Sequence, residues 1–296
     1  MAPLANCHDR YQTFIHRAAD KLRLTDHKII RAVIAETLGT LLLVFYGDSA
    51  GAQKFSSKDK ANQFLAVSLG WGAAVTVGVI VSGKAGPANL NPAIAVANTI
   101  TGRSRWSLLP AFVLAEIAGA YLAAGLILAA YHTNIYHYTM VNDSGIYLVN
   151  TTGGIFVANK GASLQSAVTD QIITTAFLAF GIYAIIDNKL VEKPAHFTPA
   201  AVGLIVFLAI GTYTANASSA LNPARDLGPR LLLLSTYWGP TAFQIDNYYF
   251  WVPLFMPTVG AVVGAILYEL LIGIHTDEAA PYPDEPKESI DELSIY

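Results

Sequence analysis

Six long apolar runs follow one another along this chain, separated by short polar segments. They cover residues 30–48, 62–82, 107–131, 166–186, 199–214 and 248–273. A helix of about 20 apolar residues crosses the roughly 30 Å of hydrocarbon in a bilayer. Glycines recur within the runs, and small residues let membrane helices approach one another closely. The pattern therefore predicts six membrane-spanning helices.

Two further apolar stretches, at 85–101 and 215–234, depart from this pattern because Gly, Pro and Asn interrupt the first half of each. The uninterrupted apolar part of each is too short to span a bilayer, and each stretch is too apolar for a loop in water. Irregular backbone at membrane depth is tolerated only where it is buried in protein or lines an aqueous cavity. We therefore expect two re-entrant segments, each crossing half of the membrane.

Composition agrees with a membrane protein and excludes other classes. Of the 296 residues, 53% are hydrophobic and 13% are charged, about half the charged fraction of a typical soluble domain. The formal net charge of −3 offers no basic surface for nucleic acid. One cysteine excludes a disulfide framework or a cysteine-based metal cluster, and the seven histidines lack metal-ligand spacing. With no nucleophile triad or phosphate loop either, we expect neither an enzyme nor a bound cofactor or metal.

Basic residues predict the orientation in the membrane. They are frequent in residues 1–31, whereas the long connection 132–165 contains only Lys160. The positive-inside rule then places the N-terminus in the cytosol, although Lys54, Lys58 and Lys60 in the first external loop run against it. Six spans return the acidic tail, residues 276–296, to the cytosol. The outer loop 132–165 carries two N-glycosylation sequons, at Asn142 and Asn150.

The chain contains an internal repeat. Leu90-Asn91-Pro92-Ala93 recurs as Leu221-Asn222-Pro223-Ala224. After the cytosolic segment 1–29, the membrane domain 30–275 thus divides into a first repeat at about 30–131, the loop 132–165 and a second repeat at about 166–275. Each repeat has three spans, an odd number, so the two enter the membrane from opposite faces. Such inverted repeats build many solute pathways.

Helix capping gives the repeated tetrapeptide its chemistry. Asn is a favoured N-cap and Pro is favoured at the first helical position, so the sequence predicts helices that begin at Pro92 and Pro223. Both would point the positive ends of their dipoles at one mid-membrane region. The carboxamides of Asn91 and Asn222 can donate hydrogen bonds into the lumen. A water held there accepts from the protein and turns its protons away, which interrupts proton conduction and repels cations.

With these features the chain resembles the aquaporin superfamily over roughly residues 30–275. The resemblance implies an all-α right-handed bundle of six transmembrane helices and two re-entrant half-helices, assembled as a homotetramer in the plasma membrane without a cofactor. Asp226, directly after Arg225 in the second box, is similar to the glycerol-facilitator branch, as is Asp170-Gln171 at the start of the fourth span.

The resemblance also implies the residues of a selectivity filter. Arg225 matches the arginine of the outer constriction, with an ion pair to a neighbour such as Asp226 as the alternative role, and Trp71 matches its aromatic wall. Ser219 stands where the best-known glycerol facilitators often have a large aromatic residue, which favours a wider filter. The fifth-span position is Ile210 without a gap or Gly211 with a gap of one residue.

Three residues are expected to support the re-entrant loops. The resemblance assigns Glu36 to the backbone amides of the first loop, which explains a carboxylate inside an apolar span. Gln171 takes this place in the second repeat, and Asp226 is the third supporting residue.

Three functions fit these features. The first is a passive channel for glycerol, related small polyols or other neutral solutes, and water. The second is a channel mainly for water. The third is an alternating-access transporter, because inverted repeats and broken helices also suit that mechanism.

Overall fold

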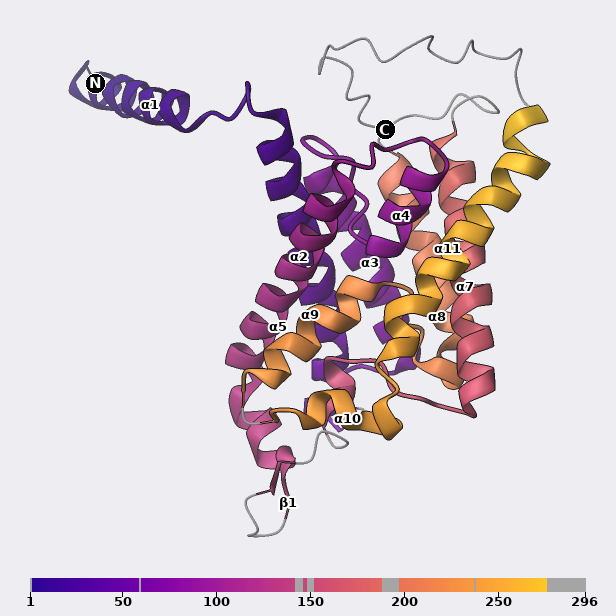
Figure 1. The fold of residues 1–296 in the computed structure, drawn as a ribbon. Coiled ribbons are helices and arrows are strands. Elements are labelled where there is room, and N and C mark those ends of the chain that lie inside the picture. Colours follow the sequence, from indigo (N-terminus) through magenta and orange to yellow (C-terminus); the bar gives the residue numbers. More distant parts are fainter. Residues whose placement is uncertain are drawn as a thin grey trace.

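A computed structural model describes residues 2–58, 60–141, 146–147, 152–187, 197–236 and 238–275. Six of its helices are long and apolar enough to cross a membrane, and they stand side by side in one bundle (Figure 1). The six helices are α2 (Lys28–Ser56), α3 (Phe64–Ser82), α5 (Leu109–Thr139), α7 (Leu164–Ile186), α8 (Thr198–Ala217) and α11 (Trp251–Leu271). The predicted number and order of spans are confirmed.

The helices α2 and α5 continue furthest beyond the apolar runs that predicted them. The first run ends at residue 48, whereas α2 continues to Ser56; the third ends at residue 131, whereas α5 continues to Thr139. An apolar run marks the length of helix that lipid can cover. The backbone hydrogen bonds of a helix are satisfied just as well in water, so the helix itself ends elsewhere.

The two re-entrant segments contain the short helices α4 (Pro92–Ile100) and α9 (Pro223–Leu234). They begin at the predicted prolines, which confirms the capping argument. Figure 1 shows α4 in the half of the bundle that carries the N-terminus and α9 in the opposite half. Their N-terminal ends meet between the two halves.

Helix packing follows the internal repeat. Within each repeat the first and third spans pack together, as α2 with α5 and α7 with α11, and α3 packs against α8 between the repeats. Each half-helix packs on the third span of the other repeat: α4 lies against α11, and α9 lies against α5. The two repeats are therefore interlocked.

The crossing of α3 and α8 depends on two glycines. A Cβ placed on Gly72 would lie 2.6 Å from the backbone oxygen of Gly203, and a Cβ on Gly203 would overlap the carbonyl of Gly72. Any side chain at this crossing would separate the helices, so small residues set their distance.

Smaller elements complete the described chain. They are α1 (Ala2–Leu22), the two-residue antiparallel strands β1 (Met140–Val141) and β2 (Ile146–Tyr147), η1 (Gly153–Ile155), α10 (Thr241–Tyr248) and η3 (Gly273–His275). The sequence did not predict α1, which extends away from the bundle (Figure 1). Tyr11, Phe14 and Ile15 lie on one exposed side of it.

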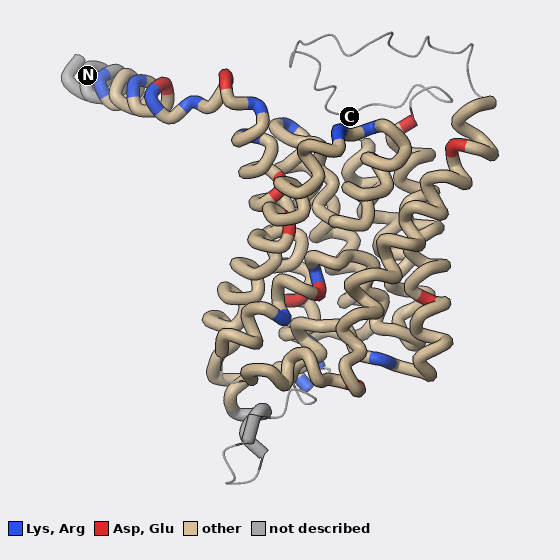
Figure 2. The backbone as a smooth tube through the Cα atoms, in the orientation of Figure 1, with Lys and Arg blue, Asp and Glu red and all other residues tan. Residues whose placement is uncertain are grey.

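Charged residues are concentrated at the two ends of the bundle, and a small group lies inside it near α9 (Figure 2). The interior group is costly at membrane depth and marks the part of the molecule where function is expected.

Candidate functional site

A continuous cavity of about 1690 Å³ runs through the bundle. Its lining includes Lys28 and Lys84 on the side of the N-terminus, and Lys58 and Asn159 at the opposite end. Asn91 and Asn222 line it between these ends. The cavity thus connects both faces of the bundle past the two Asn-Pro-Ala boxes.

The two boxes are joined through their asparagine side chains. Asn91 Nδ2 donates to the backbone oxygen of Leu221 at 2.9 Å, and Asn222 Nδ2 donates to that of Leu90 at 2.7 Å. Each Oδ1 caps its own helix by accepting from the second residue on, Ala93 or Ala224, at 2.9 Å. An amide nitrogen carries two protons, so one N–H of each asparagine braces the opposite loop and the other can face the lumen.

Sequence reasoning predicted the donors and the caps but not this cross-bracing. The bracing carbonyls belong to residues with left-handed backbone: φ is +54° at Leu90 and +57° at Leu221. Such a conformation is unfavourable for a residue with a side chain, and it turns each carbonyl toward the facing half.

Glu36 and Gln171 hold these two loops. The carboxylate of Glu36 accepts from the backbone amides of Asn89 at 3.0 Å and Leu90 at 2.8 Å. Gln171 Oε1 accepts from the amide of Leu221 at 3.1 Å, and its Nε2 donates to Ala217 O at 3.2 Å. Both side chains are fully buried. The two side chains therefore form hydrogen bonds with backbone groups of the loops, which lipid could not provide.

Trp71 and Arg225 meet beside the cavity on the α9 side of the boxes. The guanidinium carbon of Arg225 lies 4.8 Å from the Trp71 ring centroid, and Nη1 donates to Phe156 O at 2.9 Å. A Cβ on Gly47 would overlap the indole of Trp71, so the ring lies directly on the backbone of α2. The apolar indole face of Trp71 and the N–H donors of the Arg225 guanidinium thus line the same passage.

The remaining predicted filter residues divide into two groups. Ile210 and Ser219 line the cavity, and both are buried. Gly211 is exposed on the outside of α8, and nothing lies within 4 Å of a Cβ placed there. The geometry therefore places the ungapped position, Ile210, and not Gly211, at the passage.

Asp226 pairs with Arg230 and not with Arg225. Asp226 Oδ2 lies 2.5 Å from Arg230 Nε, and Oδ1 accepts from the backbone amide of Ala158 at 2.7 Å. Arg230 also donates to the carbonyls of Ala158 and Ala242. Asp226 is the wrong partner for Arg225 because one helical turn brings residues i and i+4 together, whereas adjacent side chains diverge. The ion pair of Arg225 is instead with Asp48 of α2.

On the α9 side of the boxes, sequence reasoning missed two buried charged residues. Arg230, 1% exposed, ties α9 to the segment after η1 and to α10. Asp48, also 1% exposed, lies in α2 with Oδ1 3.4 Å from Arg225 Nη2. The signal for Asp48 was available: it is a carboxylate at the end of an apolar run, where an unpaired charge is unfavourable.

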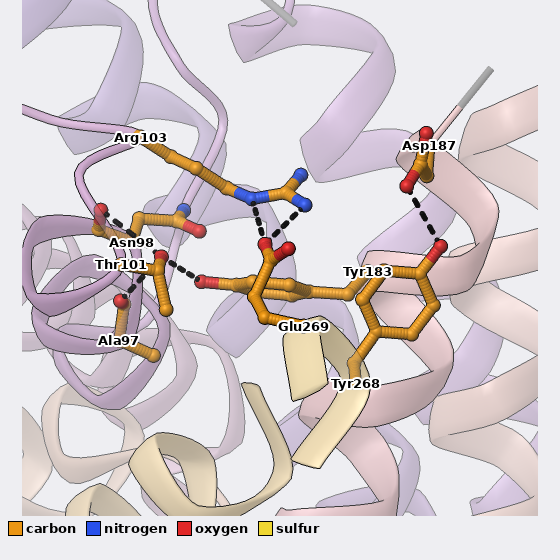
Figure 3. Close-up of polar contacts among 8 residues, drawn as sticks. All are labelled: Ala97, Asn98, Thr101, Arg103, Tyr183, Asp187, Tyr268 and Glu269. Atoms are coloured by element: carbon orange, nitrogen blue, oxygen red, sulfur yellow. Dashed lines mark hydrogen bonds and ion pairs between the residues drawn. The ribbon is translucent and has the colours of Figure 1, made fainter. Parts of the chain in front are cut away.

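The opposite mouth contains a second polar group (Figure 3). Arg103, just after α4, donates to Glu269 Oε1 of α11 through Nε at 2.9 Å and Nη2 at 2.6 Å, and it lies 4.3 Å over the Tyr183 ring. The Tyr183 hydroxyl is 2.8 Å from Thr101 Oγ1. These contacts fasten the end of α4 to α7 and α11.

Among the described residues there is no cluster of three or more potential metal ligands. The sequons at Asn142 and Asn150 and the tail 276–296 lie outside the described residues.

Comparisons with known proteins agree with this architecture. The family model described as "Major intrinsic protein" matches residues 23–268. Human aquaporin-10 is 35% identical over 269 residues, covering 90% of this chain and 87% of the relative; human aquaporin-9 is 31% identical over 255 residues, covering 84% and 85%. The X-ray structure of the aquaglyceroporin from Plasmodium falciparum superposes with a TM-score of 0.74 at 31% identity, covering 83% of this chain and 98% of that one. The six spans, the paired half-helices and these matches together assign the chain to the major intrinsic protein family of membrane channels, the aquaporins.

Proposed function

We propose that the protein is a passive channel for glycerol and related small neutral solutes together with water, and that it excludes ions and protons. The observation that carries the proposal is the outer passage, where Trp71 faces Arg225, in a cavity that the small Ser219 also lines. A polyol has a carbon side, which suits the indole, and hydroxyls that accept from the guanidinium. Human aquaporin-10 and the aquaglyceroporin from Plasmodium falciparum are relatives of this chain, which supports the same conclusion.

A channel is favoured over an alternating-access carrier by the continuity of the cavity. Its lining reaches both faces of the bundle in a single conformation, whereas a carrier closes one face while the other is open. The caps at Asn91 and Asn222 also brace each other across the repeats, which suits a fixed pore.

Glycerol permeation is favoured over strict water selectivity by the size of the side chains at the passage. Ser219 and Ile210 line it, and neither offers the bulk and polarity of a histidine. A wider opening with one apolar side admits carbon-bearing solutes.

The assembly and its location follow as part of the same proposal. The termini are cytosolic, the plasma membrane is the host, and four copies assemble with one pore in each. Exposed apolar side chains cover the outside of the spans, among them Leu114, Phe177 and Leu204, and lipid or neighbouring protomers would cover them. Asn142 and Asn150 then face outward and are available for glycosylation.

Stopped-flow light scattering on proteoliposomes tests the function. Vesicles should shrink and reswell in a glycerol gradient, at rates linear in that gradient, and water permeability should exceed that of empty vesicles. Water flow without reswelling would make the protein a water channel. Saturation at low millimolar glycerol, or dependence on a proton gradient, would make it a carrier.

A further inference from the structure

The outer passage contains a carboxylate that the pairing of Trp71 and Arg225 does not use. Asp48 lines the cavity and is 1% exposed. Within the described part of the chain neither of its carboxylate oxygens has a hydrogen-bond partner. A buried carboxylate normally accepts several hydrogen bonds, so the two buried oxygens of Asp48 lack their usual partners at the wall of the passage.

The helix geometry explains how Asp48 reaches this position. Gly47 brings the backbone of α2 against the indole of Trp71, and the next residue extends toward Arg225. The distance from Asp48 Oδ1 to Arg225 Nη2 is 3.4 Å, close enough for charge attraction and long for a hydrogen bond to a charged donor. Arg225 directs a hydrogen bond to Phe156 O instead.

Other acids in this half of the protein are already bonded. Asp226 accepts from Ala158 N and pairs with Arg230, and Asp170 accepts from Asn216 Nδ2 at 2.8 Å. Neither Asp226 nor Asp170 lines the cavity. Asp48 therefore differs from both because its carboxylate has no hydrogen-bond partner and because it lines the cavity.

We propose that Asp48 is a specificity-determining residue of the outer passage, which accepts hydrogen bonds from permeating solutes while Arg225 donates to them. The pair has no net charge and presents acceptors and donors side by side. A hydroxyl both donates and accepts, so a polyol satisfies both residues at once. Amides such as urea carry N–H donors and a carbonyl acceptor and belong to the same class.

This proposal rests on the proposed function, because it explains which solutes pass a pore that is taken to conduct them. A role for Asp48 as an acceptor predicts a different result from a purely structural role. If Asp48 only held Arg225 in place, its loss would alter the permeabilities of all solutes together. As an acceptor for the solute, its loss affects donor-rich solutes more than water.

Asp48→Asn is the first test, because it keeps the size of the side chain and removes its charge and one of its two acceptor oxygens. In proteoliposomes we expect glycerol and urea permeability to fall about three- to tenfold, as a lost hydrogen bond to a charged group allows. Water permeability should change by less than about twofold, since a single small molecule can pass with the remaining donors. Asp170→Asn is the matched control: the same change in a buried acid outside the lumen should leave the ratio of glycerol to water permeability unaltered.

The outcomes separate the two proposals. If the unmodified protein conducts no glycerol, the proposed function fails. If it conducts glycerol and Asp48→Asn leaves the ratio of glycerol to water permeability unchanged, or lowers both permeabilities equally, the role of Asp48 is overturned while the channel function stands.

A thiol-labelling experiment tests the position of the side chain independently of selectivity. Cys7 is the single cysteine of the sequence, so Cys7→Ser gives a background in which Asp48→Cys adds one thiol. A small methanethiosulfonate applied from outside should block water flow through this variant and leave the background unaffected, and glycerol should slow the block. A variant that conducts water but is not blocked would show that residue 48 does not face the passage, and would overturn the proposal even if Asp48→Asn failed to fold.

Discussion

The side-chain amide of Asn222 donates to the carbonyl oxygen of Leu90, 132 positions earlier in the chain. Asn91 makes the reciprocal bond to the carbonyl oxygen of Leu221. The two hydrogen bonds join the starts of the two half-helices. Their relative position therefore depends on two side chains as well as on the surrounding spans.

Asn222→Asp should weaken that junction. An aspartate still caps α9, but it cannot donate to Leu90 O and brings two acceptors together. We expect the free energy of unfolding to fall by about 1–3 kcal/mol and water permeability to fall with it, measured by thermal unfolding in detergent and by stopped-flow scattering. Asn62→Asp is the control, because Asn62 Nδ2 makes a bond of the same type, to Ala50 O, away from the boxes. Equal effects of the two substitutions would contradict a special role for the junction.

Glu36 and Gln171 should not be interchangeable. Glu36 accepts hydrogen bonds from two backbone amides. In Glu36→Gln the side-chain NH₂ group would replace one acceptor oxygen, so two donors would meet at one of these amides. Gln171 also donates to Ala217 O, so Gln171→Glu would set a carboxylate against a carbonyl. Each substitution should destabilise the protein by about 2 kcal/mol, seen as a lower midpoint of thermal unfolding. A neutral result for either would mean that its loop is held by other contacts.

Ser219→Phe should narrow the passage. Because Ser219 lines the cavity and shares the hydroxyl of Thr214 with Ile210 O, a phenyl ring there should reduce the permeability of larger polyols more than that of water. Stopped-flow rates for glycerol, a five-carbon polyol and water provide the comparison. Ser219→Ala, which leaves the width unchanged, should keep the order of permeabilities. Equal losses for every solute after Ser219→Phe would remove Ser219 from the filter.

Two glycines of α8 should respond differently to the same change. Gly203→Ala introduces a methyl group against Gly72 O and Thr76 Oγ1, whereas Gly211→Ala enters open space. Overpacking of this kind costs about 1–3 kcal/mol, so the first variant should give less folded protein and a lower unfolding midpoint. Gly211→Ala should behave like the unmodified protein, by size-exclusion chromatography and thermal unfolding.

At the opposite mouth, the buried hydroxyl should matter as much as the ion pair. The side chains of Arg103 and Glu269 are 29% and 30% exposed, and exposed ion pairs contribute about 0–1 kcal/mol. Tyr183 is fully buried, and Tyr183→Phe leaves Thr101 without that partner. We expect Tyr183→Phe to destabilise by about 1 kcal/mol, and Glu269→Gln to do so by no more. A much larger effect of Glu269→Gln, in thermal unfolding at moderate salt, would contradict this ranking.

The spans and half-helices were predictable because each follows from a strong local rule. The length of an apolar run identifies a span. An Asn followed by Pro identifies the start of a helix, as α4 and α9 confirm. The amphipathic α1 was not predicted, because its apolar positions are spaced around a helix and form no long run.

The contacts that complete the passage were less accessible to sequence reasoning. Asp48 and Arg225 are 177 positions apart, and their proximity depends on how α2 and α9 both pack against α5. The pairing of Asp226 with Arg230 follows from helical spacing and was predictable, whereas the approach of Ala158 and Ala242 to Arg230 depends on loop paths. Local rules locate elements; tertiary packing decides which charges meet.

The interlocking of α4 with α11 and of α9 with α5 has a consequence for biosynthesis. When the first repeat leaves the ribosome, α4 has no third span to lie on until the final span is inserted. The first half therefore does not fold as an independent unit. The wall of the water path is complete only after the last helix has been inserted.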